Sequence, residues 1–182
     1  MKAVFALILL AGLVFVGCAQ NSTNQQQGLP LTLPPEFQQS NFAQAADGVS
    51  ASYNYLPSKM ELVTVSYAGW IDLGYATNMT SIPTLQAFFA QASSGPDVAN
   101  VSKITYTTKT IGKNKVNMVD ATATMKGPIG GTMERSMRIY WVAKNEKLLY
   151  LVLNSDKIDD KTPNYIPIMA PSVENAIANS NI

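Results

Sequence analysis

The hydrophobic and polar positions in the second half of the chain follow the pattern of consecutive β-strands. Four runs rich in β-branched and aromatic residues predict strands at 101–111, 115–126, 132–143 and 147–155. Short polar turns at Gly112–Asn114 and Lys144–Glu146 follow the first and third runs, and a loop at 127–131 follows the second. The four strands are therefore expected to form an antiparallel meander.

The pattern upstream predicts two strands and a helix. Residues 50–56 (SASYNYL) predict a strand that Pro57 ends, and residues 61–77 contain further strand-forming runs. In the segment PTLQAFFAQAS, Pro83 is expected in the first turn of a helix, with Ser81 before it as the cap. The apolar residues of this segment recur at helical spacing: Leu85, Phe88, Phe89 and Ala92.

A second helix is predicted in PNYIPIMAPSVENAIAN, where Pro171 either begins the helix or interrupts it. Its apolar side is formed by Met169, Val173, Ile177 and Ala178. The run Leu148–Leu153 is apolar at every position, which is typical of a strand covered on both faces. The predicted fold is therefore α+β: an α/β/α sandwich with a mostly antiparallel six-stranded sheet and a helix on each face, in the order β-β-α-β-β-β-β-α.

Side-chain polarity predicts the register of the strands at 115–126 and 132–143. If their loop is centred on Ile129, one face carries the polar pairs Asp120 with Arg138, Thr122 with Ser136, and Thr124 with Glu134. The other face carries the apolar pairs Val119 with Ile139, Ala121 with Met137, and Met125 with Met133. Arg135 is the exception on the apolar face, where its long stem would let the charge leave the edge of the core.

The first eighteen residues have the composition of an export signal. Met1 and Lys2 give a short positive start, and Ala3–Gly17 is uncharged and nearly all apolar, which is the length of a signal-peptide core. The segment that ends at Cys18 resembles the bacterial lipoprotein signal, in which the cysteine is diacylated on sulfur and becomes the new N-terminus. Phe15 departs from that pattern, in which leucine is usual.

Two other interpretations of this segment stay open. Ala3–Ala19 could remain as an uncleaved anchor, or Cys18 could follow an ordinary cleavage site. On the lipoprotein interpretation, residues 1–17 are a signal peptide, residues 18–48 are a flexible tether rich in Gln, Asn and Pro, and residues 49–182 are a single globular domain. Part of the tether, LPLTLPPEF, could instead pack along the domain as an extended arm.

Composition narrows the chemistry that the protein can perform. The 182-residue chain has no histidine, the usual general base and commonest metal ligand, and its single cysteine excludes an intramolecular disulfide. The chain has thirteen Lys and Arg residues and twelve Asp and Glu residues, and neither sign forms runs along the sequence. A nucleic-acid partner is therefore not expected. We expect no cofactor and no metal, although an acidic loop with Asp156, Asp159 and Asp160 could be a weak calcium site or a solvated connection.

Asp120 and Arg138 are the main candidates for a binding site, because the register places them opposite each other on the polar face. In one interpretation they form a bidentate anchor in a ligand or partner groove, together with Thr122, Ser136 and Tyr140. In the other they form a cross-strand ion pair that fixes the register and contributes about 0.2–1 kcal/mol. No catalytic residue is assigned.

Other motifs each have a structural alternative. Aromatic residues in the first two strands would form a binding face if exposed and part of the core if buried: Tyr53, Tyr55, Tyr67, Trp70 and Tyr75. Trp141 is expected in the core. Gly127, Gly130 and Gly131 lie between two strands, where a turn is expected rather than a phosphate cradle. Three Asn-X-Ser/Thr triplets are potential glycosylation sites: Asn21, Asn78 and Asn100.

Several segments match the elements of a known family. SYNYLP stands where that family has a first strand ending in Tyr-Pro, IPTLQAFFAQ where it has a helix, and TIGKNKVNMVDATAT where a Gly-Lys turn joins two strands. The segment NEKLLYLVLNS and the later pair Ser172-Val173 match its last strand and last helix. On these residues the chain resembles the PsbP-like family, whose fold PsbP, Mog and DcrB share, and within it the exported lipoprotein branch. The family's Pro-x-Gly-Trp motif is not intact, because Ser58-Lys59-Met60 follows Pro57.

The resemblance implies non-enzymatic roles, in which the protein stabilises, assembles or binds a partner at a membrane complex. We therefore expect a lipoprotein on the extracytoplasmic side of the cell membrane, tethered through Cys18, that acts as a binding or assembly module for a protein partner. The alternative is a ligand-binding lipoprotein that holds a small molecule or glycan on the polar sheet face. An enzyme without histidine is the third hypothesis.

Overall fold

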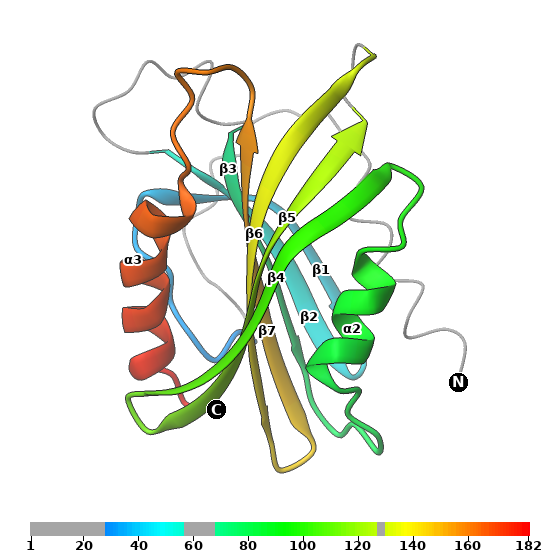
Figure 1. Cartoon of the computed structure of the whole chain (residues 1–182). Helices are drawn as coiled ribbons and strands as arrows, with labels where there is room; N and C mark the ends of the chain where they lie inside the picture. The colour runs from blue at the N-terminus through cyan, green and yellow to red at the C-terminus, as the bar shows by residue number, and fades with distance from the viewer. Residues whose placement is uncertain (1–27, 57–67, 127–129) are drawn as a thin grey trace.

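Seven strands and two helices are found in the computed structural model, which describes residues 28–56, 68–126 and 130–182 (Figure 1). The strands are β1 (Phe37–Ala45), β2 (Gly48–Tyr55), β3 (Gly69–Ala76), β4 (Val98–Ile111), β5 (Asn114–Lys126), β6 (Thr132–Lys144) and β7 (Lys147–Lys157). The helices are α2 (Leu85–Ala92) and α3 (Ile166–Ala178). Within the described residues, neither helix is long and apolar enough to cross a membrane.

All seven strands pair antiparallel in one sheet, in the order β1-β2-β3-β7-β6-β5-β4. The strands β1 to β3 form one meander, β4 to β7 form a second, and the pairing of β3 with β7 joins the two. α2 lies in the connection from β3 to the far edge strand β4, and α3 follows β7. Figure 1 shows a twisted sheet with the two helices on opposite sides.

The predicted register of the two long central strands is confirmed. On the polar face, β5 and β6 pair Asp120 with Arg138, Thr122 with Ser136, and Thr124 with Glu134. On the other face, the apolar residues pair with their predicted partners. The four predicted strands and the turns at residues 112–113 and 145–146 are also confirmed. Hairpins of this length are set by local turn residues, so their sequence signal is strong.

The predicted α/β/α sandwich, with a mostly antiparallel six-stranded sheet and a helix on each face, is wrong. The sheet has seven strands, and the helices have only 8 and 13 residues, so the described chain is mostly β. The apolar run in β7 suggested helical layers. However, such a run requires only that both faces be covered, and two short helices with neighbouring side chains and an N-terminal arm provide that cover.

The additional strand, β1, lies in residues that the sequence analysis assigned to the tether. Phe37 is its one buried side chain, and a register shift between Gln39 and Asn41 interrupts its pairing with β2. Backbone hydrogen bonds hold such an edge strand whatever its side chains are, so a polar edge strand and a linker have similar compositions. Ahead of β1, Leu31 and Leu33 are also buried. The segment LPLTLPPEF therefore packs along the domain, as the extended-arm alternative predicted.

The helix boundaries differ from the predicted ones. Thr84 caps α2, since its hydroxyl accepts a hydrogen bond from the backbone N–H of Ala87 at 3.1 Å, and the predicted cap Ser81 lies further upstream. Pro83 therefore precedes the helix instead of lying in its first turn. Pro171 neither begins nor interrupts the last helix but lies inside α3.

Two apolar clusters cover the faces of the sheet. The α3-side core includes Leu31, Leu33, Phe37, Tyr53, Ile71, Leu73, Val116, Met118, Tyr140, Leu149, Leu151, Leu153, Met169, Val173 and Ile177. The α2-side core consists of Leu85, Phe88, Phe89, Val119, Ala121, Ile139, Trp141 and Leu148. Side chains of β7 alternate between the two, which explains its uninterrupted apolar run. Trp141, predicted as core, is 2% exposed.

Two buried tyrosines of the α3-side core give a matched test of this packing. The hydroxyl of Tyr53 has no hydrogen-bond partner within the described part of the chain, and burial raises the pKa of Tyr53 to about 12. The hydroxyl of Tyr140 donates to Glu174 Oε1 at 3.0 Å. We expect Tyr53→Phe to leave the free energy of unfolding unchanged or raise it, and Tyr140→Phe to lower it by about 1–2 kcal/mol. Urea denaturation measures both, and a comparable loss in Tyr53→Phe would contradict the assignment.

Candidate functional site

The predicted pair Asp120 and Arg138 forms a bidentate ion pair across β5 and β6. Arg138 donates from Nε to Asp120 Oδ1 at 2.6 Å and from one terminal nitrogen to Oδ2 at 3.1 Å. The hydrogen bonds to Asp120 raise the pKa of Arg138 above its ordinary value. The carboxylate and one edge of the guanidinium therefore bind each other, which is the register-fixing interpretation of the pair.

The other predicted residues of this face divide into two groups. Thr122 and Ser136 lie half-buried on the same face as the ion pair, and Asn164 donates from Nδ2 to Ser136 Oγ at 3.4 Å. Tyr140, in contrast, is fully buried beneath α3, where Glu174 accepts its hydroxyl. Burial raises the pKa of Tyr140 above its ordinary value. The structure brings the first group together with the ion pair and removes Tyr140 from the open surface.

Glu174 connects this face of the sheet to α3. Its Oε1 accepts from Tyr140 at 3.0 Å and from the Lys109 ammonium at 2.6 Å. Lys109 lies on the edge strand β4, so the helix is joined by charge to one strand and by a buried phenol to another. These contacts attach α3 to the sheet and leave no open groove at Tyr140.

A polar cluster that the sequence analysis did not anticipate lies on the opposite face, around Asp72 in β3. The carboxylate accepts hydrogen bonds from the Ser52 hydroxyl at 2.8 Å, the Trp70 indole N–H at 3.3 Å and the Asn154 amide at 3.3 Å. Burial raises the pKa of Asp72, and the hydrogen bonds from Ser52 and Trp70 oppose that change only in part. The donors come from three neighbouring strands of the sheet: Ser52 from β2, Trp70 from β3 and Asn154 from β7.

Arg135, the exception in the predicted register, is paired in the same region. Its guanidinium donates to both carboxylate oxygens of Asp156, at 2.7 and 3.0 Å, and its central carbon lies 4.5 Å from the ring centre of Trp70. The charge is therefore neutralised inside the sheet, whereas the sequence analysis expected it to leave the core edge. Asp156 belongs to β7 rather than to the acidic loop.

The remaining acidic residues of that loop also have separate partners. Asp159 accepts from the backbone N–H groups of Lys161 and Thr162, and Asp160 lies 3.0 Å from the Lys157 ammonium. Within the described ranges, no group of three or more His, Cys, Asp and Glu side chains is placed to hold a metal ion. The calcium interpretation therefore gains no support from the geometry of the loop.

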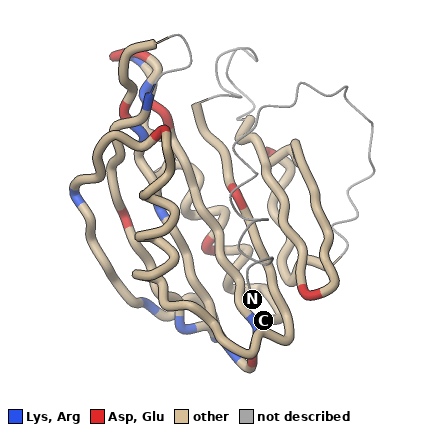
Figure 2. Tube along the Cα trace, turned by 90° about the vertical axis from the view of Figure 1, so that its right-hand side faces the viewer, with Lys and Arg blue, Asp and Glu red and all other residues tan. Residues whose placement is uncertain are grey.

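The other residues singled out from the sequence lie as follows. Tyr53 and Tyr55 are buried, Trp70 and Tyr75 are half-buried, and Tyr67 lies outside the described residues. The potential glycosylation sites Asn78 and Asn100 are both exposed, and Asn21 and Cys18 lie outside the described residues, as does Gly127. Figure 2 shows cationic and anionic residues interspersed along the described trace.

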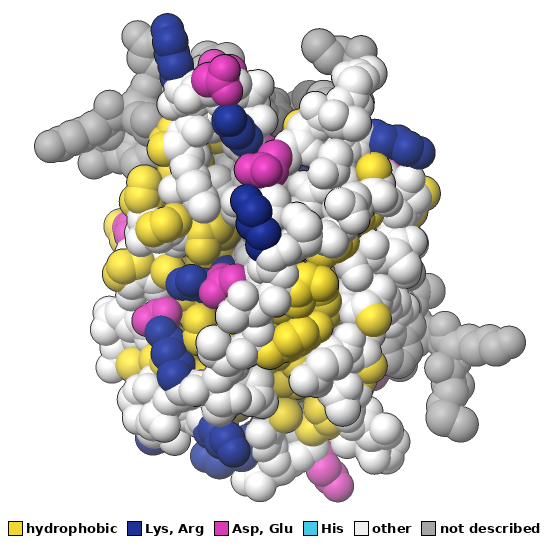
Figure 3. Space-filling model, viewed as in Figure 1, with side chains coloured by type: hydrophobic (Ala, Val, Ile, Leu, Met, Phe, Trp, Pro, Cys, Tyr) yellow, Lys and Arg dark blue, Asp and Glu magenta, His cyan; other side chains and the backbone are white. Residues whose placement is uncertain are grey.

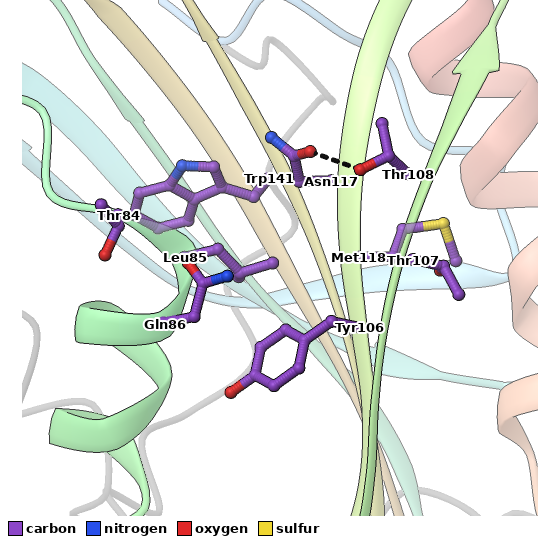
Figure 4. Close-up of a pocket in the computed structure, with 9 residues that line it drawn as sticks. All are labelled: Thr84, Leu85, Gln86, Tyr106, Thr107, Thr108, Asn117, Met118 and Trp141. Atoms are coloured by element: carbon purple, nitrogen blue, oxygen red, sulfur yellow. Dashed lines mark hydrogen bonds between the residues drawn. The ribbon is translucent and has the colours of Figure 1, made fainter.

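A groove opens between the start of α2 and the face of β4. This α2–β4 groove has a volume of about 360 Å³ and is lined by Thr84, Leu85, Gln86, Tyr106, Thr107, Thr108, Asn117, Met118 and Trp141 (Figure 4). The side chains of Thr107 and Met118 point to the other side of β4 and β5, so only their backbone atoms line the groove. The volume is in the range of small-molecule pockets.

Packing of the aromatic rings fixes the walls of the α2–β4 groove. Tyr106, 44% exposed, meets Phe89 of α2 edge-to-face, with ring centres 6.3 Å apart. Trp141 forms the buried end, where its ring centre lies 4.9 Å from that of Phe88. Asn117 Oδ1 accepts a hydrogen bond from the Thr108 hydroxyl at 2.8 Å. Rigid rings and two linked polar side chains thus form a preorganised surface.

Among the residues that the structure describes, no charged side chain lines the α2–β4 groove. In Figure 3, hydrophobic side chains gather between β4 and α2, and most charged side chains of that view lie in a band to their left, toward α3. The residue pattern does not reveal this site, because Tyr106 lies in a strand rich in polar residues and Gln86 lies on the exposed side of a helix. Only the crossing of α2 over β5 brings the two together.

Comparison with known proteins gives only distant similarities to solved structures. No family model matches the chain, and neither does any curated protein. Among solved structures, the fold is similar to that of LpqN, a protein involved in cell envelope biogenesis of Mycobacterium tuberculosis, with a TM-score of 0.41 and 13% sequence identity over 84% of this chain and 83% of LpqN. A similarity of this size carries no functional argument, and the PsbP-like resemblance stays a prediction.

Asp72 predicts an unusual dependence of stability on pH. Its pKa in the folded protein is raised above the value of 3.8 for a free carboxyl, so its contribution favours folding at low pH and is lost as the pH rises through the folded pKa. Asp72→Asn removes this contribution. The unfolding free energy of Asp72→Asn relative to the unsubstituted protein should therefore increase between about pH 3 and pH 7. Urea denaturation at several pH values measures this difference.

Asp159 provides a control of opposite sign. Hydrogen bonds from Thr162 and from the backbone N–H of Lys161 lower the pKa of Asp159, so it stabilises the fold above the free-carboxyl pKa and loses that effect as the pH falls. The relative stability of Asp159→Asn should accordingly decrease as the pH rises. If the relative stability of Asp72→Asn also decreased as the pH rises, the hydrogen bonds to Asp72 would lower its pKa more than burial raises it, which would contradict the prediction.

Proposed function

We propose that this chain is an exported lipoprotein, anchored to the membrane through Cys18, that acts as a non-enzymatic binding or assembly module outside the cytoplasm. The observation that carries the proposal is the N-terminal sequence, in which Lys2 precedes the uncharged apolar stretch Ala3–Gly17 and Cys18 follows directly. This segment lies outside the described residues, so the proposal rests on its composition and order.

The position of the arm is compatible with such an anchor and shortens the expected tether. Leu29, Leu31 and Leu33 pack against the α3-side core, so a tether can extend only over residues 19–27. A random coil of that length would span on average about 17 Å, compared with about 30 Å for the thirty residues 19–48 of the predicted tether. An anchored domain would therefore stay close to the membrane surface.

A non-enzymatic role is supported by the residues that the chain lacks and by the way its polar side chains are used. The sequence contains no histidine, so general-base catalysis would have to rely on carboxylates. Two carboxylates of the sheet, those of Asp120 and Asp156, are each bound bidentately by an arginine. A third, that of Asp72, accepts three hydrogen bonds from neutral donors, and Glu134 of β6 is exposed.

A ligand-binding lipoprotein is the second candidate, and the α2–β4 groove is the observation that favours it. On the residue pattern, such a ligand is expected on the polar face around Asp120, Arg138, Thr122, Ser136 and Tyr140. Mutual pairing of the two charges and the burial of Tyr140 leave that face with fewer free donors than expected. The groove on the other side of the sheet has an exposed ring and unused polar groups.

Substitution of Cys18 tests the anchor. In a bacterial host that processes lipoproteins, the full chain should partition with membranes, and mass spectrometry should find an N-terminal peptide that begins with a diacylated Cys18. Cys18→Ser removes the acylated sulfur, so the variant should lose this modification and leave the membrane fraction. Phe15→Leu keeps Cys18 and restores the usual residue of the signal, so it should be processed at least as completely.

Two outcomes would contradict the proposal. An unmodified Met1 on the protein in the membrane fraction would exclude export with cleavage, and Cys18→Ser that still partitions with membranes would exclude the lipid as the anchor. The second outcome, combined with an intact N-terminus, would indicate that Ala3–Ala19 remains as an uncleaved anchor.

A further inference from the structure

The α2–β4 groove presents a surface of uncharged groups. Because no charged side chain of the described ranges lines it, a charged ligand would lose its hydration there without gaining an ionic partner. The polar side chains are hydroxyls and amides, which both donate and accept hydrogen bonds. The groove is therefore suited to a neutral ligand that carries many groups of the same dual kind.

Several of these groups keep hydrogen-bonding capacity. Asn117 uses Oδ1 as the acceptor for Thr108, which leaves its amide hydrogens and the oxygen lone pairs of Thr108 for a ligand. Thr84 Oγ1 accepts from the backbone N–H of Ala87, which leaves the Thr84 hydroxyl hydrogen. The Gln86 side chain is exposed and has no hydrogen bond within the described part of the chain.

Tyr106 adds an aromatic face beside these polar groups. Tyr106 is 44% exposed, although Phe89 contacts its ring edge-to-face at 88°. An exposed ring held in place by packing offers apolar area at little cost in conformational entropy. The C–H face of a sugar ring is a natural partner for such a ring, because its hydroxyls project at the rim.

We propose that the α2–β4 groove binds an uncharged glycan, with a sugar ring against Tyr106 and its hydroxyls hydrogen-bonded by Gln86, Thr108 and Asn117. An extended peptide added to the edge of β4 fits less well. A register shift between Ser102 and Thr105 interrupts the edge, where Lys103 has a φ of 53°. Moreover, the groove lies on the face of β4 rather than along its edge.

The test measures binding of neutral trisaccharides to the full chain in detergent. Maltotriose, cellotriose, mannotriose and chitotriose are titrated by isothermal calorimetry up to about 10 mM, and at least one should bind with a dissociation constant of about 1 mM or tighter. Tyr106→Ala should weaken that binding about tenfold. Ile104→Ala is the matched control, since Ile104 lies in the same strand, is 46% exposed and does not line the groove.

Three results would overturn the inference. These are the absence of binding for all four trisaccharides, equal losses in Tyr106→Ala and Ile104→Ala, and equally tight binding of trigalacturonate or of trialanine at the same site. The last result would indicate an anionic glycan or a peptide as the ligand. Since Cys18→Ser leaves the groove unchanged, failure of the anchor and failure of glycan binding are separate outcomes.

Discussion

The pairing of β7 with β3 is the contact on which the sheet depends, because it joins the two meanders of the described chain. It runs over eight residue pairs, from Gly69 with Ser155 to Ala76 with Leu148. Gly74 lies opposite Tyr150, whose ring occupies the space that any β-carbon at Gly74 would need. Tyr150 in turn packs against Phe88 of α2, so this one missing side chain also positions the helix beside the groove.

Most of the second meander could be predicted from the sequence, whereas the first strand could not. The polarity of Asp120 and Arg138 on one face, and of Val119 and Ile139 on the other, was sufficient to fix the β5–β6 register. β1 has no such signal, because Phe37 is its only buried side chain and its partner strand is set by backbone hydrogen bonds. Periodicity identifies strands that bury side chains, and edge strands bury few.

The functional residues also differ in how far the sequence could predict them. A cross-strand pair such as Asp120 and Arg138 follows from a two-strand register, which is local in the chain. The α2–β4 groove requires Gln86 and Tyr106 to meet across a helix crossing, and the Asp72 cluster requires β3 to pair with β7, about eighty residues away in sequence. No spacing between neighbouring residues encodes such contacts, so residue patterns gave no signal for either.

The arm at residues 28–36 determines where a pull from the N-terminus would act. The backbone N–H of Asn181, beyond α3, donates to the Pro30 carbonyl at 3.2 Å, and the Ser172 hydroxyl of α3 donates to Glu36 at 3.0 Å. The arm is therefore fastened to the last helix and the C-terminal residues, on the face of the sheet opposite the groove. Tension along a tether would load α3 and its neighbouring core first, and the groove would face away from the point of attachment.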